Sequence, residues 1–322
     1  MLEKGMIMLN QMRLMRAAES GSLERIELLA AKGTDIDSRD QYGATALMKS
    51  SLWGELSTAE LLLDLGAEVN ARETVFGSTA LIFASLAGHA EVVQLLLERG
   101  AQVNSATRVG GTALMAAARE GHEDVVKMLL ENGAEVGCRD KRGFTALTEA
   151  SREGHLSVVE MLLESSADPN IADRDGRTPL FWACYKGHAA VAELLLESGA
   201  IPDRKDRHDN TPLVWACFKN HMPVADMLLD HGADVNYETK TGYSPLLIAS
   251  AAGHRRMVNL LLERGADINS ANYRGYTALF VAYAARRADV LKALVFRHLS
   301  QGRAFASSQQ KPAPFRNDGE PI

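Results

Sequence analysis

Residues 173–203 read DRDGRTPLFWACYKGHAAVAELLLESGAIPD, and this stretch decides the fold. It opens with turn residues, among which glycine supplies a positive φ. Thr178 can cap a helix whose first residue is Pro179, because proline needs no N–H partner at that position. This helix is expected to end at Gly187. A second helix follows, with apolar residues at helical spacing, and Gly199 closes it in the left-handed conformation.

The tripeptide Thr-Pro/Ala-Leu of this stretch recurs along most of the chain. The first spacing is 34 residues, and the next six are 33 residues each. A degenerate copy around Met12 lies one period before the first tripeptide, so nine units are predicted. The copies begin at Thr45, Thr79, Thr112, Thr145, Thr178, Thr211, Ser244 and Thr277.

The predicted helices are too short to be stable in isolation, where roughly 12 to 15 residues are marginal. Each unit must therefore bury its apolar face against its neighbours. The repeat predicts an all-α solenoid in which the turns project from one edge.

The pattern G-x-T-P/A-L-x-x-A, then G-H, then L-L-x-x-G-A-x-V/I-N resembles the ankyrin repeat, which has a 33-residue period. The resemblance implies β-turn fingers, stacked antiparallel helix pairs and a concave binding face. We expect an array of about nine ankyrin repeats over residues 1–304, with the first and last as capping units. Residues 305–322 lose the period and are expected to form a disordered C-terminal tail.

Some positions depart from the pattern. The glycine between the two helices is replaced by Asn220 in the seventh unit and by Arg286 in the ninth. The closing glycine is Ser166 in the fifth unit, which predicts a weak point there. The histidine expected after Thr-Pro-Leu is absent from every unit.

The composition excludes several classes of protein. The 322 residues are 46% hydrophobic, carry a net charge of −6 and contain no apolar run long enough to cross a bilayer. No signal peptide is recognised, and three cysteines do not make a disulfide framework. A cytoplasmic monomer without membrane association is therefore expected.

Catalysis, metals and cofactors are not expected. Six histidines occupy one repeat position in different units, too far apart to share a metal ion, and we interpret them as structural. Cys184 and Cys217 are equivalent residues of adjacent units and are interpreted as small packed side chains. No phosphate-binding glycine loop or nucleophile elbow occurs, so we expect no enzymatic activity.

The sixth and seventh units suggest a binding surface. They read FWACYKGH and VWACFKNH, which places aromatic and lysine side chains at matched positions near the end of the first helix. Such a composition is typical of an interface core, and the adjacent fingers would form a polar rim. The predicted partner-binding residues are Trp182, Tyr185, Lys186, Trp215, Phe218 and Lys219 on the helices, and Arg174, Asp175, Arg177, Arg207, His208 and Asn210 on the fingers.

These features predict a non-enzymatic scaffold that binds a protein through its concave face, centred on repeats six and seven. Trp182 and Trp215 are equally consistent with core packing. Nucleic acid is not expected, because residues 173–210 hold six basic and seven acidic side chains. Two alternatives stay open: an adaptor whose tail carries a linear motif around Pro312, and a bacterial effector that binds host proteins.

Overall fold

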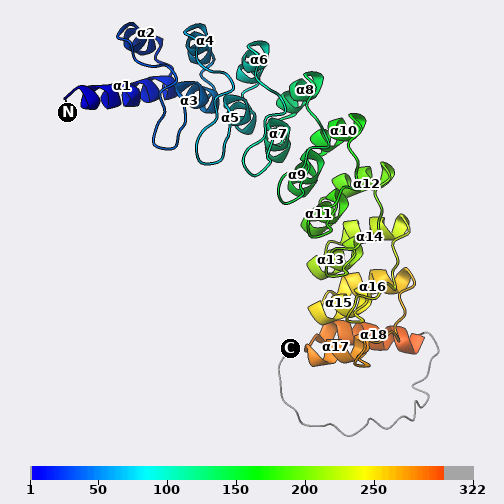
Figure 1. The fold of residues 1–322 in the computed structure, drawn as a ribbon. Coiled ribbons are helices and arrows are strands. Elements are labelled where there is room, and N and C mark those ends of the chain that lie inside the picture. The colour runs from blue at the N-terminus through cyan, green and yellow to red at the C-terminus, as the bar shows by residue number, and fades with distance from the viewer. Residues whose placement is uncertain (1, 301–322) are drawn as a thin grey trace. The chain divides into compact units, whose positions relative to one another are not determined.

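The computed structural model describes residues 2–300, and the predicted C-terminal tail lies outside this part of the chain. The described residues form helices and no named strand, which confirms the all-α expectation (Figure 1). The helices are α1 (Leu2–Glu19), α2 (Leu23–Ala31), α3 (Ala46–Trp53), α4 (Leu56–Asp64), α5 (Ala80–Ala87), α6 (Ala90–Glu98), α7 (Ala113–Glu120), α8 (Glu123–Glu131), α9 (Ala146–Glu153), α10 (Leu156–Glu164), α11 (Pro179–Lys186), α12 (Ala189–Glu197), α13 (Pro212–Lys219), α14 (Met222–Asp230), α15 (Pro245–Ala252), α16 (Arg255–Glu263), α17 (Ala278–Ala284) and α18 (Ala288–Ser300).

The sixth repeat shows how the sequence sets these bounds. The Thr178 hydroxyl accepts a hydrogen bond from the Phe181 N–H at 3.2 Å, and Pro179 is the first residue of α11. Gly187 ends α11 with a φ of 86°, and the residue after α12 is followed by Gly199 at a φ of 87°. Both caps are those that the sequence predicts.

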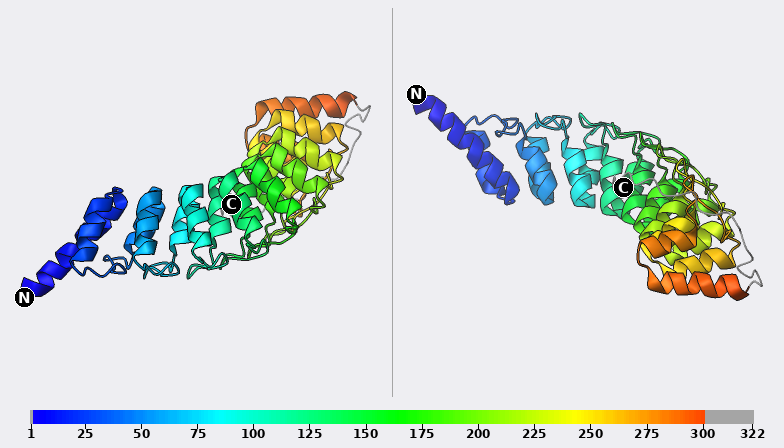
Figure 2. Two further views of the ribbon diagram at one scale, coloured as in Figure 1. Left: turned by 90° about the horizontal axis from the view of Figure 1, so that it is seen from above. Right: turned by 90° about the horizontal axis from the view of Figure 1, so that it is seen from below.

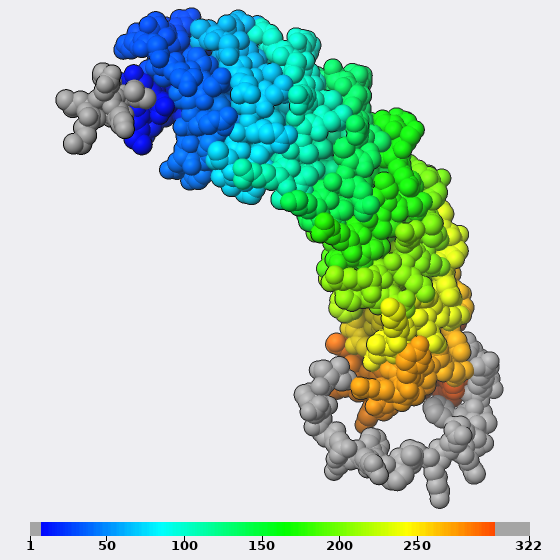
Figure 3. All heavy atoms as spheres, in the orientation of Figure 1, coloured from blue at the N-terminus to red at the C-terminus, as the bar shows by residue number. Residues whose placement is uncertain are grey.

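The helices fall into two compact units, Met1–Asp234 and Val235–Ile322. In the first unit, α1, α3, α5, α7, α9, α11 and α13 pack in sequence order, and the second helices of successive repeats pack on one another behind them. The fingers follow one edge of this unit in both views of Figure 2, and its repeats form a continuous surface in Figure 3. The second unit consists of α15 to α18, paired in the same manner. A single array over residues 1–304 stays a prediction.

The repeated histidines join neighbouring repeats of the first unit. The Nε2–H of His122 donates to the Leu86 carbonyl at 3.1 Å, and His89, His155, His188 and His221 make the same bond at 2.9–3.1 Å. Each ring lies against the glycine that ends the preceding first helix. A Cβ at Gly121 would lie 2.5 Å from His155 Nδ1, so this glycine is needed for both its φ and its size. For these five histidines, the structural interpretation is confirmed.

Asparagines in the loops after the second helices make another tie. Asn170 Nδ2 donates to the Gly199 carbonyl at 3.0 Å, and its Oδ1 accepts from the Ile201 N–H at 2.9 Å. Asn70 and Asn104 make the same two bonds within the first unit, and Asn236 makes them within the second. The amides therefore serve as structural bridges.

The departures from the repeat keep the backbone of the residue that they replace. Ser166, Asn220 and Arg286 all adopt a positive φ, at 66°, 64° and 57°. In the ninth repeat, Arg287 stands where the third to eighth repeats carry histidine, and its Nε donates to the Ala251 carbonyl at 3.0 Å. The local conformation is thus preserved where the side chain is not.

Candidate functional site

The predicted site lies on the face that the first helices and the fingers share in the first unit (Figure 1). An aromatic cluster occupies this face at α11 and α13. Its ring centroids are 5.3 Å apart for Tyr185 and Trp215, 5.8 Å for Trp215 and Phe218, and 6.0 Å for Trp182 and Tyr185. These pairs meet edge to face, which aromatic quadrupoles favour. The structure therefore brings the four predicted aromatic residues together.

The two tryptophans are half-buried and differ in their polar contacts. Trp182 Nε1–H donates to Asp173 Oδ2 at 3.1 Å. The Nε1 of Trp215 is buried without a hydrogen-bond partner among the described residues. The equivalent carboxylate, Asp206, instead receives the Asn210 side-chain amide at 3.4–3.5 Å. Both tryptophans therefore contribute to packing and leave part of their rings on the surface.

Phe218 is the exposed end of the cluster. Its side chain is 51% exposed, whereas Tyr185 is half-buried among three other aromatic rings. The Lys219 ammonium lies 4.7 Å from the Tyr185 ring centroid and 5.6 Å from that of Phe218. Lys186 is exposed at the end of α11. Phe218, Lys186 and Lys219 are thus the exposed groups at the ends of these two helices.

The fingers hold their polar residues through buried aspartates. Asp173 accepts the backbone N–H groups of Asp175 and Arg177, and Asp206 accepts those of His208 and Asn210. The predicted rim is only partly free. Asp175 pairs with Arg207 at 2.6 Å and with Arg177 at 3.5 Å.

The predicted rim residues differ in whether they contact other side chains or are exposed to solvent. The Arg177 guanidinium lies 5.3 Å from the ring centroids of both Phe181 and Trp182. Arg174 is exposed, and no ion pair involves it among the described residues. His208 is exposed, and Asn210 turns toward Asp206. Arg177 therefore contacts the cluster and Asn210 bonds within its own finger, while Arg174 and His208 are exposed.

Sequence reasoning missed the extension of the cluster into the fifth repeat. The Phe144 ring lies 5.5 Å from Trp182, with the Arg142 guanidinium 4.2 Å above it. Arg142 also pairs with buried Glu149 at 2.6 Å, and Arg152 pairs with the other oxygen of that carboxylate at 3.2 Å. Burial alone would lower the pKa of Arg142, but its ion pairs with Asp140 and Glu149 raise it. The signal was Phe144 itself, since the neighbouring fourth and sixth repeats carry Gly111 and Arg177 at that position.

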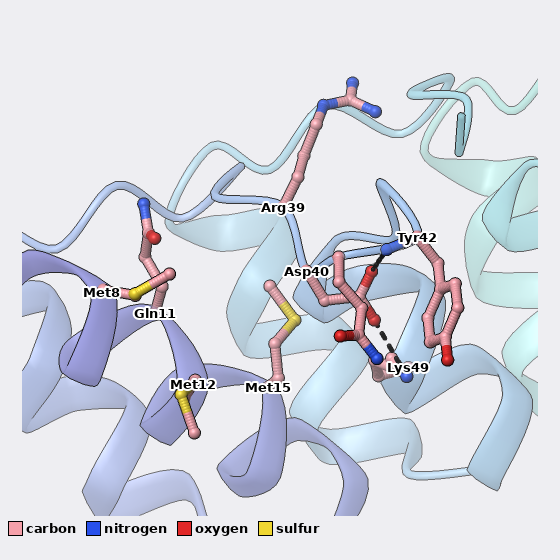
Figure 4. A pocket seen from close by; sticks show the side chains of 9 residues that line it. Met8, Gln11, Met12, Met15, Arg39, Asp40, Tyr42 and Lys49 are labelled. Atoms are coloured by element: carbon pink, nitrogen blue, oxygen red, sulfur yellow. Dashed lines mark hydrogen bonds and ion pairs between the residues drawn. The ribbon is translucent and has the colours of Figure 1, made fainter. Parts of the chain in front are cut away.

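A second feature of this unit is a pocket of about 390 Å³ between α1 and the finger of the second repeat (Figure 4). Met8, Met12 and Met15 line one side, and Tyr42 lines the other. Lys49 pairs with Asp40 and Glu19, both at 3.2 Å, at its polar end. Burial opposes ionisation of Asp40, yet the N–H groups of Ala44 and Tyr42 together with Lys49 lower its pKa. This pocket combines an apolar wall with a fixed ion pair.

Among residues 2–300, the side chains of the titratable residues form no cluster of metal ligands. Cys184 and Cys217 are fully buried free thiols, and burial raises the pKa of both. In the same part of the chain, no helix has the length and apolar character that would let it cross a membrane.

Comparison with known proteins agrees with the repeat geometry. The family description "Ankyrin repeats (3 copies)" matches residues 14–107, 105–173 and 166–239, and "Ankyrin repeats (many copies)" matches residues 228–282. The chain belongs to the ankyrin-repeat family. It is also similar to YahD of Escherichia coli (strain K12), designated an ankyrin repeat protein, at 32% identity over 57 residues. That match covers 18% of this chain and 28% of YahD.

Ankyrin repeats generally mediate protein–protein interaction, and the family is typically non-enzymatic. The family match extends into both compact units and includes every residue of the aromatic cluster.

Proposed function

We propose that this ankyrin-repeat protein is a non-enzymatic cytoplasmic scaffold. It binds a protein partner as a monomer, through the face formed by the first helices and fingers and centred on repeats six and seven. The observation that carries the proposal is the aromatic cluster, which begins on buried rings and ends on exposed Phe218 beside Lys219.

The physical argument is preorganisation. Each ring of the cluster contacts at least one neighbour, so the surface presents aromatic area that is already ordered. A partner then binds without the entropic cost of ordering those side chains. Exposed aromatic residues are also typical of interface centres, where a few residues supply most of the affinity, and the lysines would belong to the polar rim.

Affinity capture from the native lysate tests the proposal, with bound proteins identified by quantitative mass spectrometry. Three baits are compared: the wild type, a test variant and a control variant. The test variant is Phe218→Ala, which removes the exposed end of the cluster and leaves the buried rings. Leu156→Ala is the matched control, because Leu156 is a 42% exposed apolar residue at the start of α10, on the second-helix face. Thermal unfolding of both variants checks that the array is intact.

We expect at least one protein to be retained by the wild type and by Leu156→Ala but lost with Phe218→Ala. The same set of proteins from all three baits would contradict the proposed site.

A further inference from the structure

The finger tips of repeats two to seven are joined by backbone hydrogen bonds. Each tip donates one N–H to a carbonyl of the preceding finger. The first bond of the series joins the Thr74 N–H to the Tyr42 carbonyl at 3.1 Å, and the last joins the Arg207 N–H to the Asp175 carbonyl at 2.7 Å. The intermediate bonds join Arg108 to Phe76, Lys141 to Val109 and Arg174 to Arg142, at 2.6–2.8 Å. We call this row the finger edge. Since its backbone is fixed, equivalent side chains of successive repeats project at a regular interval.

The finger edge has two chemically different halves. Repeats two to four present an apolar half, in which Tyr42, Phe76 and Val109 are 58%, 62% and 52% exposed. Repeats four to seven present a basic half, made of the exposed side chains of Arg108, Lys141, Arg142, Arg174 and Arg207. Tyr42 also lines the methionine pocket, so the apolar half continues into that pocket (Figure 4).

The basic half is stronger than the sequence count suggests, because one aspartate in each of the fifth, sixth and seventh fingers points inward. Asp173 and Asp206 are buried, and the side chain of Asp140 is only 7% exposed. Each accepts at least two backbone N–H groups of its own turn. Lys141 and Arg174 have no ion-pair partner among the described residues.

Exposed acidic residues gather instead on the second helices. They include Glu91, Glu98, Glu123, Asp124, Glu131, Glu160, Glu164, Glu193 and Glu197. The first unit is therefore electrically polarised, with the basic pole along the finger edge, and such a pole attracts acidic partners.

We infer that the finger edge binds an extended segment of a protein partner, with apolar residues opposite repeats two to four and acidic residues opposite repeats four to seven. This inference rests on the proposed function and names the chemistry of the partner. Packed helices lie about 8–10 Å apart, and an extended chain advances about 3.3 Å per residue. The acidic residues of the segment should therefore recur at every third position.

A protein segment fits this surface better than a nucleic acid does. Bases stack on free aromatic faces, whereas the rings next to the basic half contact one another edge to face or lie beneath cations. The Phe144 ring, for example, lies beneath Arg142 and against Trp182. Asp175 also interrupts the basic row at the sixth finger.

Fluorescence anisotropy with labelled synthetic peptides tests the inference on the full chain. The first peptide carries glutamate at every third position of a serine and proline background, with leucines at one end. A second peptide has the same composition with contiguous glutamates, and a third lacks the leucines. A single-stranded oligothymidylate is a separate probe.

The decisive variant is Lys141→Glu with Arg174→Glu. Its matched control, Lys32→Glu with Lys127→Glu, makes the same charge change at exposed positions of the second-helix face. We expect the decisive variant to weaken binding of the spaced peptide about tenfold or more, because like charges would then face each other. The control should stay within about twofold, because its charges lie at the second helices and not on the finger edge. Tyr42→Ser with Phe76→Ser should weaken only peptides that carry the leucines.

Three results would overturn the inference: no peptide binds at low salt, both double charge reversals weaken binding equally, or the contiguous peptide binds as well as the spaced one. If oligothymidylate bound more tightly than the peptides and its binding also depended on Lys141 and Arg174, the ligand of the finger edge would be a nucleic acid and not a protein segment. Loss of capture with Phe218→Ala reports on the proposed function separately, so the two failures are distinguishable.

Discussion

Asp203 occupies the loop position that asparagine fills after repeats two, three and five. Its Oδ2 accepts the Asp234 N–H at 3.0 Å, as the asparagine oxygens do for the equivalent N–H groups. Its Oδ1 is buried and has no hydrogen-bond partner among the described residues. Asn170 uses its amide group at that point to donate to the Gly199 carbonyl. An ionised carboxylate has no proton to donate, and burial raises the pKa of Asp203 above its ordinary value of 3.8.

We expect Asp203→Asn to stabilise the protein at neutral pH by about 1 kcal/mol, the contribution of one restored hydrogen bond. The folded state binds a proton at Asp203 more tightly than the unfolded chain does. The free energy of unfolding therefore falls as the pH rises from 3.8 through the raised pKa. The gain from the substitution should accordingly be full at neutral pH and shrink as the pH falls toward 3.8.

Urea unfolding across this pH range measures the effect. Asn170→Asp is the reciprocal control and should destabilise the protein with the same pH profile. A gain from Asp203→Asn that does not change with pH would show that ionisation of Asp203 is not its cause.

Ser166 is a second residue whose side chain is unfavourable for the backbone conformation of its position. Its φ of 66° lies in the left-handed region, which costs a residue with a Cβ roughly 1 kcal/mol. Ser166→Gly should therefore raise the free energy of unfolding by roughly 0.5–1 kcal/mol, after the greater freedom of glycine in the unfolded chain is taken into account. Thermal or urea unfolding measures this change.

The neighbouring Ser165 provides the control. It has the same side chain and a φ of −82°, so Ser165→Gly should lower stability. Equal effects of the two substitutions would mean that backbone strain at Ser166 is not relieved by glycine.

At the scale of the element, helix bounds could be predicted from the sequence because their determinants are local. Thr178 caps α11 and Gly187 ends it through contacts within a few residues, so a single repeat contains the information. The aromatic cluster was predictable only in part. Trp182 and Phe218 were recognised because they repeat in neighbouring units, whereas Phe144 has no such counterpart and reaches the cluster through packing between repeats.

The loops that join a second helix to the next repeat differ in whether they contain the bridging asparagine. Gly137 stands where Asn104 and Asn170 lie in neighbouring repeats, so the loop after the fourth repeat lacks the amide bridge. No atom lies within 4 Å of a Cβ built on Gly137, and its φ is not in the left-handed region. An asparagine therefore fits there without strain.

We expect Gly137→Asn to add the two missing bonds, to the Ser166 carbonyl and the Asp168 N–H, by analogy with Asn104 and its partners Gly133 and Glu135. The gain should be about 1–2 kcal/mol, from hydrogen bonding and from the lower entropy of the unfolded chain. The urea midpoint measures it, and Asn104→Gly should produce a loss of similar size. If Gly137→Ala gave the same gain as Gly137→Asn, the amide bridge would have no part in it.

For the whole molecule, the net charge of −6 conceals how charge is distributed. Asp173 and Asp206 count equally with Glu193 and Glu197 in the sequence, yet the first two are buried in turns and the last two are exposed on α12. The sequence count therefore missed the basic finger edge. The separation of charge depends on which side chains the turn geometry buries, and composition does not contain that information.

The ties between repeats also constrain how the chain can change in length. The histidine bond spans 36 residues and the asparagine bond spans 31 residues at most junctions. Where the third finger carries one additional residue, the two spans become 37 and 32. The extra residue is absorbed in a finger, because both ties fasten the chain outside the finger tips. An extra residue in a finger therefore leaves both ties in place, and so does the gain or loss of an entire 33-residue repeat.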